Sequence, residues 1–424
     1  MKPLIAAPLD PDFQPAVLWN RDYIKAVKAS GQAVPLVIGL EREKGLLSRF
    51  ETVVTRTPDA ETLRYVERLV KFLLWARGGW KIFIGGPKAI GEFIRKTCSP
   101  TGARRFDCEM MSTAYGKKFQ VVVTTPGTIP ANSEMKVAAG GHLKGCRIGF
   151  DLGASDYKVS AVVDGEAIFT EEAPWDPKSQ PNPEYHYHHI SAALHRAAAH
   201  LPRVDAIGGS SAGVIVDNEI RVASLLRAIP KKDFPKAADI FKRIQKEWNV
   251  PVLVMNDGDV TALAGALSLR KTGMLGIAMG SSEAAGFMDK QGRILGWLNE
   301  LAFAPVDYNP AAAADEWSGD RGVGALYFSQ QAVNKLLPAA KIYETIGVYL
   351  GYAMAHYADF YDFRHALILG RVTTGKGGDI VIDRAREVLN QEFPAVAKKN
   401  RAACAGRKIA ARRPGGGRRQ SAGS

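Results

Sequence analysis

The stretch that most constrains the fold runs from Arg147 to Ala167 and reads RIGFDLGASDYKVSAVVDGEA. Short apolar runs alternate there with a Gly-containing turn and an Asp-Gly turn, which predicts an antiparallel β-meander. The first turn is unusually polar, since it gathers Asp151, Ser155, Asp156 and Lys158. A carboxylate at a strand end can hold Mg²⁺ through water, and small turn residues let backbone N–H groups approach phosphate. An ordinary hairpin explains the same stretch, so these residues alone leave both interpretations open.

The overall composition places the chain among ordinary globular proteins. Its 424 residues predict two or three domains, and its apolar and charged fractions are unexceptional. The four cysteines form neither a CxxC pair nor a zinc-ligand spacing, which indicates a reducing compartment. The N-terminus lacks an apolar signal core, and no stretch reaches the roughly 18 apolar residues of a membrane span. We therefore expect a cytoplasmic protein with no membrane partner.

The net charge of +13 belongs mainly to the C-terminal end. Nine Lys and Arg residues and no acid lie between Lys398 and Ser424, which leaves about +4 for the rest (13 minus 9). Residues 393–424 lack an apolar period and are expected to form a basic, disordered tail. The tail could contact nucleic acid through its charge. A solvated end or an altered reading frame explains it as well, so nucleic acid is not expected as a partner.

Residues 1–145 predict an N-terminal α+β or α/β domain of unknown role. Two strands are expected around Glu41–Gly45, followed by a helix that ends at Gly78-Gly79. The turn at 85–87 opens the next helix and could hold an anion, although such a turn more often only connects. This region shows no cluster of catalytic groups and no convincing helix-turn-helix.

Three histidines, His186, His188 and His189, suggest a metal cluster. No carboxylate or thiol completes the set, so we expect a surface loop leading into a helix.

Two later stretches place polar groups at the ends of apolar strands. Residues 208–213 form a Gly- and Ser-rich turn, where backbone amides and hydroxyls can meet a polar ligand, or where a tight loop needs positive φ. The buried-strand run 250–255 ends in Asn256-Asp257 and opens a helix at once, which is the usual ligand position of open α/β sheets. Asp257 could be a general base there, whereas Asp259 is expected to be the helix N-cap.

The order of motifs resembles the ROK family of sugar kinases and sugar-sensing regulators, within the fold group of actin, the heat-shock chaperone ATPases and the sugar kinases. The resemblance covers about residues 147–392 and rests on five stretches: GFDLGASDYKVSAVV, AIGGSSAGVIVDNEI, VPVLVMNDGDVTALAGAL, LGIAMGSSEAAGF and LILGRVTTG. It implies an α/β protein with two RNase H-like lobes around an ATP cleft, the actin-like ATPase fold. The small lobe is expected over 146–256 and the large lobe over 257–392, after the N-terminal domain.

The resemblance implies ATP-dependent phosphoryl transfer to a hydroxyl of a sugar or related polyol, with ATP and Mg²⁺ as cofactors and Asp257 as general base. Asp151 would hold Mg²⁺ through water. The implied nucleotide- and phosphate-binding residues are Asp151, Gly153, Ala154, Ser155, Lys158, Gly280, Ser281, Ser282, Gly286 and Gly370. The implied substrate-binding residues are Ser211, Gly213, Asn256, Asp257 and Glu300. Family members often dimerise, so a homodimer is possible.

The sequence departs from the family pattern on the sugar side. The family's histidine falls on Phe303, and its zinc loop, Cys-Gly-x-x-Gly-Cys, falls on residues 318–323, where both thiolates are missing. No zinc site is expected, and the acceptor need not be glucose. These losses favour the alternative of a non-catalytic sugar or nucleotide sensor, whereas the retained Asn256-Asp257 opposes it. A third alternative is a hydrolase or activator ATPase of the same fold group.

Overall fold

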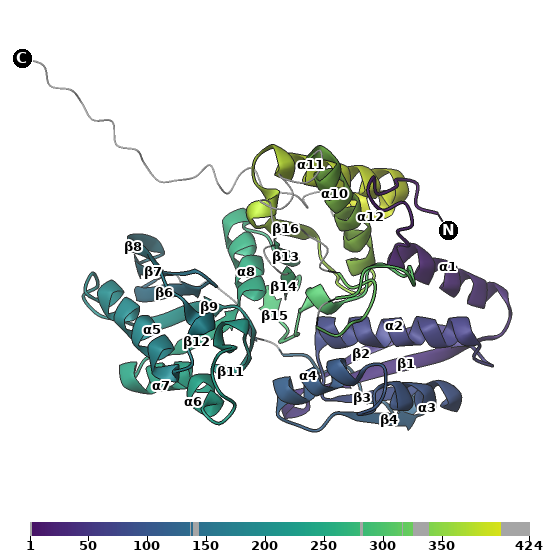
Figure 1. Cartoon of the computed structure of the whole chain (residues 1–424), viewed down its shortest axis with the longest axis horizontal. Coiled ribbons are helices and arrows are strands. Elements are labelled where there is room, and N and C mark those ends of the chain that lie inside the picture. Colours follow the sequence, from purple (N-terminus) through teal and green to yellow (C-terminus); the bar gives the residue numbers. More distant parts are fainter. Residues whose placement is uncertain are drawn as a thin grey trace, which may run out of the picture.

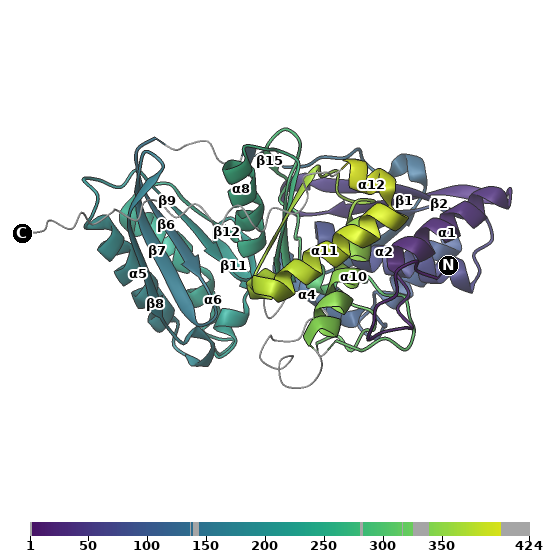
Figure 2. The same ribbon diagram turned by 90° about the horizontal axis from the view of Figure 1, so that it is seen from above.

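The structure is a computed structural model that describes residues 2–135, 137–138, 144–279, 283–315, 317–324 and 339–399. An N-terminal α/β domain, a small lobe and a large lobe follow one another along the chain (Figure 1). Seen from above, the small lobe and the N-terminal domain lie at opposite ends, with the strands of the large lobe between them (Figure 2).

The N-terminal domain is a mixed sheet with helices packed on it. Its elements are α1 (Ala16–Ala29), β1 (Ala33–Glu41), β2 (Leu47–Thr55), α2 (Ala60–Arg77), β3 (Lys81–Gly85), α3 (Lys88–Thr97), α4 (Arg105–Tyr115) and β4 (Gln120–Thr124). The strand order is β2-β1-β3-β4, and only β3 and β4 run parallel. Helix α2 begins where the Asp59 side chain accepts a hydrogen bond from the Thr62 N–H, and it ends at Gly78, whose φ is +77°. The two predicted strands and the predicted helix are thus confirmed.

The small lobe is built on the predicted meander. Its elements are β6 (Cys146–Leu152), β7 (Asp156–Val163), β8 (Glu166–Pro174), α5 (Pro183–Ala198), β9 (Ala206–Ser211), β10 (Val214–Val216), β11 (Glu219–Val222), α6 (Phe234–Ala238), α7 (Ile240–Trp248) and β12 (Val252–Asn256). The sheet order is β12-β9-β6-β7-β8. Strands β6, β7 and β8 pair antiparallel, while β9 and β12 continue the sheet in parallel from β6.

The large lobe repeats the first part of this plan. Its elements are α8 (Asp257–Leu269), β13 (Met274–Met279), β14 (Glu283–Met288), β15 (Arg293–Ile294), the short 3₁₀ helix η5 (Leu301–Phe303), α10 (Ala339–Tyr357), β16 (His365–Leu369), α11 (Gly375–Glu392) and α12 (Pro394–Lys399). The sheet order is β16-β13-β14-β15-β5, where β5 (Val137–Ala138) comes from the segment before the small lobe. None of the helices in the described ranges is both long enough and apolar enough to cross a membrane.

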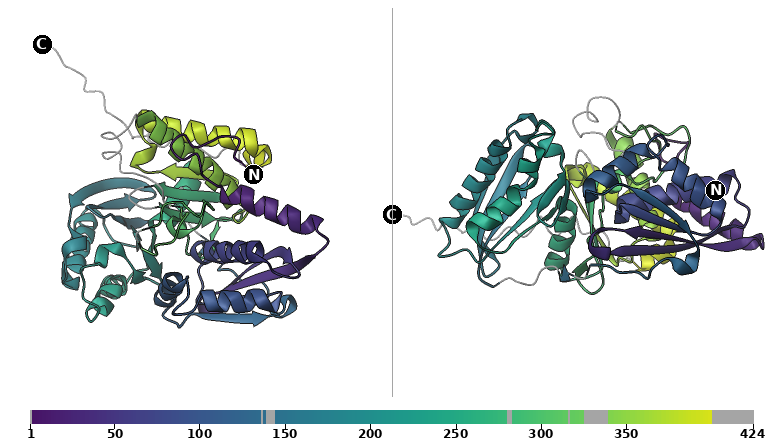
Figure 3. Two further views of the ribbon diagram at one scale, coloured as in Figure 1. Left: turned by 45° about the vertical axis from the view of Figure 1, so that its right-hand side comes forward. Right: turned by 90° about the horizontal axis from the view of Figure 1, so that it is seen from below.

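Both lobes therefore consist of an antiparallel meander whose first strand gains a parallel neighbour on its other side. In the small lobe that neighbour is β9, and in the large lobe it is β16. This order is that of an RNase H-like sheet, and it confirms the predicted α/β class with two related lobes. Figure 3 shows the two sheets from further sides.

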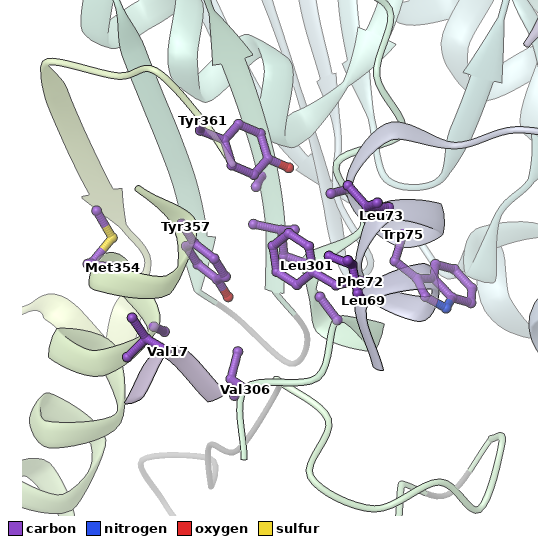
Figure 4. Close-up of a cluster of buried hydrophobic side chains, with 14 of the residues drawn as sticks. Val17, Leu69, Phe72, Leu73, Trp75, Leu301, Val306, Met354, Tyr357 and Tyr361 are labelled. Atoms are coloured by element: carbon purple, nitrogen blue, oxygen red, sulfur yellow. The ribbon is translucent and has the colours of Figure 1, made fainter. Parts of the chain in front are cut away.

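The N-terminal domain and the large lobe share one continuous hydrophobic core. Figure 4 shows Val17 of α1, Phe72 of α2, Leu301 of η5 and Tyr357 of α10 converging in it. Residues before α1 also bind the large lobe, since the Ile5 N–H donates to the Tyr352 hydroxyl at 3.3 Å. The small lobe has a separate core of its own.

Two sequence predictions need correction here. Helix α12 extends to Lys399, and Phe393, just before it, is only 4% exposed. The segment is held because Phe393 packs into the shared core and Lys399 Nζ lies 3.0 Å from Asp362. The prediction of disorder is thus wrong for 393–399, while residues 400–424 lie outside the described residues.

The histidine segment is also helical rather than a surface loop. Helix α5 begins at Pro183 because the Asn182 side chain caps it. His186 is buried, and its Nε2 lies 3.0 Å from the Pro177 carbonyl oxygen. Across the residues that the structure describes, no three His, Cys, Asp or Glu side chains are placed to hold a metal ion together.

Candidate active site

The carboxyl ends of three parallel strands bring separate motifs together in the small lobe. The register of β6 and β9 sets Asp151 opposite Ser210, and that of β9 and β12 sets Ser211 opposite Asn256. The Ser210 hydroxyl donates a hydrogen bond to Asp151 Oδ1. Polar groups at such an edge can meet a ligand because the strands end there. Asp151 and Asn256, predicted from different stretches, therefore belong to one edge of one sheet.

The two serines at the end of β9 point to opposite faces of the sheet. Ser211 is 2% exposed and lies with Leu152 and Phe241 around a small interior cavity of the small lobe. Its neighbour Ser210 is on the other face, where it contacts Asp151. The alternation of side chains along a strand is the signal that could have separated them, because residues opposite one another share a face. Ser210 is therefore the serine that contacts Asp151, whereas the predicted Ser211 lies opposite Asn256 and stays a prediction.

Asn256 contacts two other predicted substrate-side residues, Gly213 and Glu300. Its side-chain Oδ1 accepts from the Gly258 N–H at 2.8 Å and so caps helix α8. Its Nδ2 donates to the Gly213 carbonyl oxygen at 2.9 Å and lies 3.4 Å from Glu300 Oε1. Gly213 is required there because its φ is +117° and a Cβ would lie 2.3 Å from the Val222 carbonyl oxygen. The predicted N-cap, Asp259, is instead inside the first turn.

Carboxylates crowd the start of α8, and burial raises their pKa values. Burial raises the pKa of Asp257, the Gly258 N–H lowers it, and the charge of Asp151 raises it again. Burial raises the pKa of Asp259 to about 7, although Asn299 Nδ2 donates to it at 3.2 Å. Burial, with the charges of Asp257 and Asp259, raises the pKa of Glu300 to about 8. The site therefore combines a carboxylate of enhanced basicity with a Glu300 that is protonated at neutral pH.

The raised pKa of Glu300 predicts that the contribution of this residue to the free energy of unfolding falls as the pH rises. The folded protein keeps this proton above the ordinary pKa of 4.5, so the stabilisation is complete below pH 4.5 and is lost as the pH rises towards 8. The Glu300→Gln variant removes this contribution. We expect it to equal the wild type near pH 4.5 and to exceed it by about 1–3 kcal/mol at pH 8.5. Urea unfolding at both pH values measures the difference, and equal stability at both would contradict the assignment.

The first polar turn is held in shape by Trp175. The Gly153 N–H donates to the Asp156 carbonyl oxygen at 2.9 Å, and Trp175 Nε1 donates to the Gly153 carbonyl oxygen at 2.9 Å. Ala154 and Ser155, between them, are exposed. Lys158 lies opposite Asp151 in the register, and its Nζ is 3.9 Å from Asp156. The turn is therefore preformed, with an exposed cation and exposed small residues beside Asp151.

The other predicted phosphate residues divide into three cases. Residues 280–282 lie outside the described residues. Gly370 follows β16 directly beside the end of β13, where its φ is +126° and a Cβ would lie 1.8 Å from the Met279 carbonyl oxygen. The prediction that Gly286 binds phosphate needs correction, because Gly286 is buried inside β14 and a Cβ would lie 2.2 Å from the Gly258 carbonyl oxygen. We assign Gly286 to the close packing of β14 against α8.

The N-terminal domain contacts the two segments at which the sequence departs from the family pattern. Phe303 stacks on Trp75 of α2 with ring centroids 4.3 Å apart. Asp320, in the loop that replaces the zinc motif, lies 3.0 Å from Arg68, 2.9 Å from Lys71 and 2.7 Å from Arg104. An ion cluster with the N-terminal domain therefore fixes this loop.

Helix α2 also fixes the segment that carries Glu300. The backbone N–H groups of residues 298–300 donate to the carbonyl oxygens of residues 77, 76 and 75, at 3.3, 3.1 and 3.0 Å. The last carbonyls of a helix have no partner within the helix, so they can accept such bonds. No sequence signal pointed to this contact, which joins residues more than two hundred positions apart.

Comparison with known proteins gives a remote similarity in structure. No protein-family model matches the sequence, and the search of curated proteins found no match either. A ROK family glucokinase from Streptomyces griseus, solved with glucose and AMPPNP, is 19% identical, with a TM-score of 0.43 over 58% of this chain and 88% of its own. The chain resembles the ROK family. A ROK hexokinase from Thermus thermophilus is 16% identical, with a TM-score of 0.45 over 58% of this chain and 90% of its own.

A regulator also appears among the similar structures. A ROK family transcriptional regulator, a homologue of the E. coli MLC protein, is 20% identical, with a TM-score of 0.43 over 60% of this chain and 69% of its own. The resemblance that the motifs predicted is therefore found with kinases and with a regulator alike.

Proposed function

We propose that the protein transfers a phosphoryl group from ATP to a hydroxyl of a sugar or related polyol. The observation that carries the proposal is the group formed by Asp257, Asn256 and Glu300, at the end of a buried parallel strand and within the electrostatic reach of Asp151. It combines a base with hydrogen-bonding groups that can orient a hydroxyl-rich acceptor.

In this mechanism the chain's own residues position the acceptor and remove its proton. Asn256 and Glu300 hold acceptor hydroxyls, and Asp257 takes the proton from the attacking hydroxyl as the phosphoryl group arrives. The Gly258 N–H donates to Asp257 Oδ1 at 3.0 Å and lowers the pKa of Asp257, which favours the ionised form that a base requires. The protonated Glu300 avoids a further negative charge beside the incoming phosphates.

ATP and Mg²⁺ fit the groups on the phosphate side. The backbone of Gly153–Ser155 and the Lys158 ammonium would bind phosphate oxygens. Asp151 would hold Mg²⁺, a cation that proteins usually bind through one or two carboxylates together with water and substrate phosphates. Asp151 is exposed, and among the described residues a hydrogen bond from Ser210 engages its Oδ1 alone, so its carboxylate suits such a role. The bound ion would neutralise phosphate charge. A cytoplasmic location belongs to the same proposal.

A second candidate is a non-catalytic sugar or nucleotide sensor. It is favoured by the bonds between the end of α2 and residues 298–300, because they tie the acceptor side to the N-terminal domain. A ligand that moves Glu300 would therefore act directly on that domain.

A panel of sugars and polyols with ATP and Mg²⁺, followed by ADP release, separates the candidates. A kinase should release ADP only with its acceptor. ATP binding without turnover on any acceptor would favour the sensor, and ADP release without an acceptor would favour an ATPase of this fold group.

A further inference from the structure

A second polar cleft lies where the N-terminal domain meets the large lobe. Its volume is about 420 Å³, within the size range of small-molecule sites. Arg49, Arg77 and Glu134 line it from the N-terminal part of the chain, and Asp289, Arg293 and Trp297 line it from the large lobe. None of these residues belongs to the candidate active site, and none is accounted for by phosphoryl transfer.

Among the residues that the structure describes, no carboxylate forms an ion pair with the Arg77 guanidinium, although the charge of Glu134 acts on it from a greater distance. The guanidinium lies 3.3 Å from the centroid of the Trp297 ring and donates to the Phe360 carbonyl oxygen. Its Nε is buried and has no hydrogen-bond acceptor within the described ranges. Burial lowers the pKa of Arg77 to about 10, and the charge of Arg42 lowers it further, whereas Tyr361 and the charge of Glu134 raise it. A buried cation that makes no ion pair is unfavourable, so an anion that pairs with it would be stabilised.

The acids near Arg77 are already engaged by other groups. Glu134 accepts from Arg42, from the Ser48 hydroxyl at 2.7 Å and from Trp297 Nε1 at 2.9 Å. Asp289 pairs with Arg293 at 2.6 Å. The cleft is lined by three arginines and two acids. Arg293 pairs with Asp289, and Arg49 pairs with Glu51 at 2.8 Å, so among the described residues Arg77 is the lining arginine without an ion pair.

We propose that this cleft is a binding site for a small anionic ligand that presents phosphate or carboxylate oxygens to Arg77, with Arg49 and Arg293 beside it. A guanidinium is a planar fork of N–H donors that matches such oxyanions and holds them by charge-assisted hydrogen bonds. Arg77 is the last residue of α2, whose final carbonyls hold residues 298–300. A ligand bound there would thus contact the helix end that fixes Glu300. The proposal does not depend on kinase activity.

Isothermal titration of the full chain tests the site, with inorganic phosphate and citrate as separate probes at low ionic strength. We expect saturable binding of at least one probe, and the better probe shows which oxyanion the site prefers. Arg293→Gln and Arg49→Gln should each weaken binding about tenfold or more, since a hydrogen bond to a charged group contributes about 1.5–3 kcal/mol. Arg77→Lys, which keeps the charge but loses the fork, should weaken binding too. Arg105→Gln, an exposed arginine of α4 paired with Glu109 at 3.8 Å, is the matched control and should bind as the wild type does.

Two results would overturn the site. One is the absence of saturable binding of both probes to the wild type. The other is unchanged affinity in folded Arg49→Gln and Arg293→Gln, with circular dichroism as the check on folding. Phosphate bound at the turn of residues 153–158 would give the second pattern and would be lost in Lys158→Gln, which separates that site from this cleft.

Discussion

The Asp257→Asn variant is expected to transfer the phosphoryl group about 10²–10⁴-fold more slowly than the wild type, the usual loss when a general base is removed. Asparagine has nearly the same shape but cannot take a proton at this position. Burial and the charge of Asp151 raise the pKa of Asp257, so the native carboxylate is a better base than an exposed aspartate. The rate is measured as ADP release with the acceptor that the sugar panel identifies.

The control separates the loss of the base from a loss of folding or of nucleotide. Asp239→Asn removes an exposed aspartate that pairs with Lys242 at 3.0 Å, and it should keep the wild-type rate. Asp257→Asn should bind ATP with unchanged affinity, and it should be at least as stable as the wild type, because it relieves the repulsion with Asp151. A normal transfer rate in Asp257→Asn would exclude this residue as the base.

The free energy of unfolding of the Asp320→Asn variant is expected to fall by about 3–5 kcal/mol, the usual effect of removing one partner of a buried ion pair. The Lys71 side chain is fully buried, and Arg68 and Arg104 are nearly so. Removal of the carboxylate leaves these cations with less compensation in a region of low polarity. Urea unfolding at pH 7 measures the loss.

An exposed ion pair provides the matched comparison. Glu92→Gln removes a partner of Arg95 at 2.7 Å, where both side chains are close to half exposed, and it should change stability by about 0–1 kcal/mol. An Asp320→Asn variant no less stable than Glu92→Gln would show that the cluster does not hold the loop.

The pH dependence of Asp320 has the opposite sign to that of Glu300. The cations around Asp320 hold its pKa below the ordinary value of 3.8, although burial opposes them. Its stabilisation is therefore present above pH 3.8 and is lost as the pH falls through the lower, folded pKa. Asp320→Asn should accordingly show a smaller loss of stability on acidification than the wild type.

These contacts give a structural reason for the two segments at which the sequence departs from the family pattern. Phe303 stacks on Trp75 where the family has a histidine, and Asp320 pairs with three cations where the family has a zinc loop. Both partners belong to the N-terminal domain. The added domain thus supplies the packing and the charges that fix these segments, and it also bonds to the backbone of residues 298–300.

Local sequence patterns were sufficient for the meander, for helix α2 and for the strand-to-helix junction at Asn256-Asp257, because turn chemistry and apolar periodicity act over a few residues. They were insufficient where a local pattern had two solutions. The two serines at 210 and 211 are equivalent in sequence, and only their pairing with β6 puts Ser210 beside Asp151. Gly286 fits a phosphate turn by composition, but the backbone of α8 fills the space above it.

The sequence by itself determined the order of the two lobes and the polar strand ends, since each depends on residues close together in the chain. Only the tertiary structure decided what Phe303 and Asp320 contact and what holds Glu300. Helix α2 meets residues 298–303 and Asp320 through stacking, ion pairs and backbone hydrogen bonds between segments far apart in the sequence. The meander that opens the small lobe can be predicted because its strands are neighbours along the chain. The contact with the N-terminal domain cannot, because its partners are far apart in the sequence.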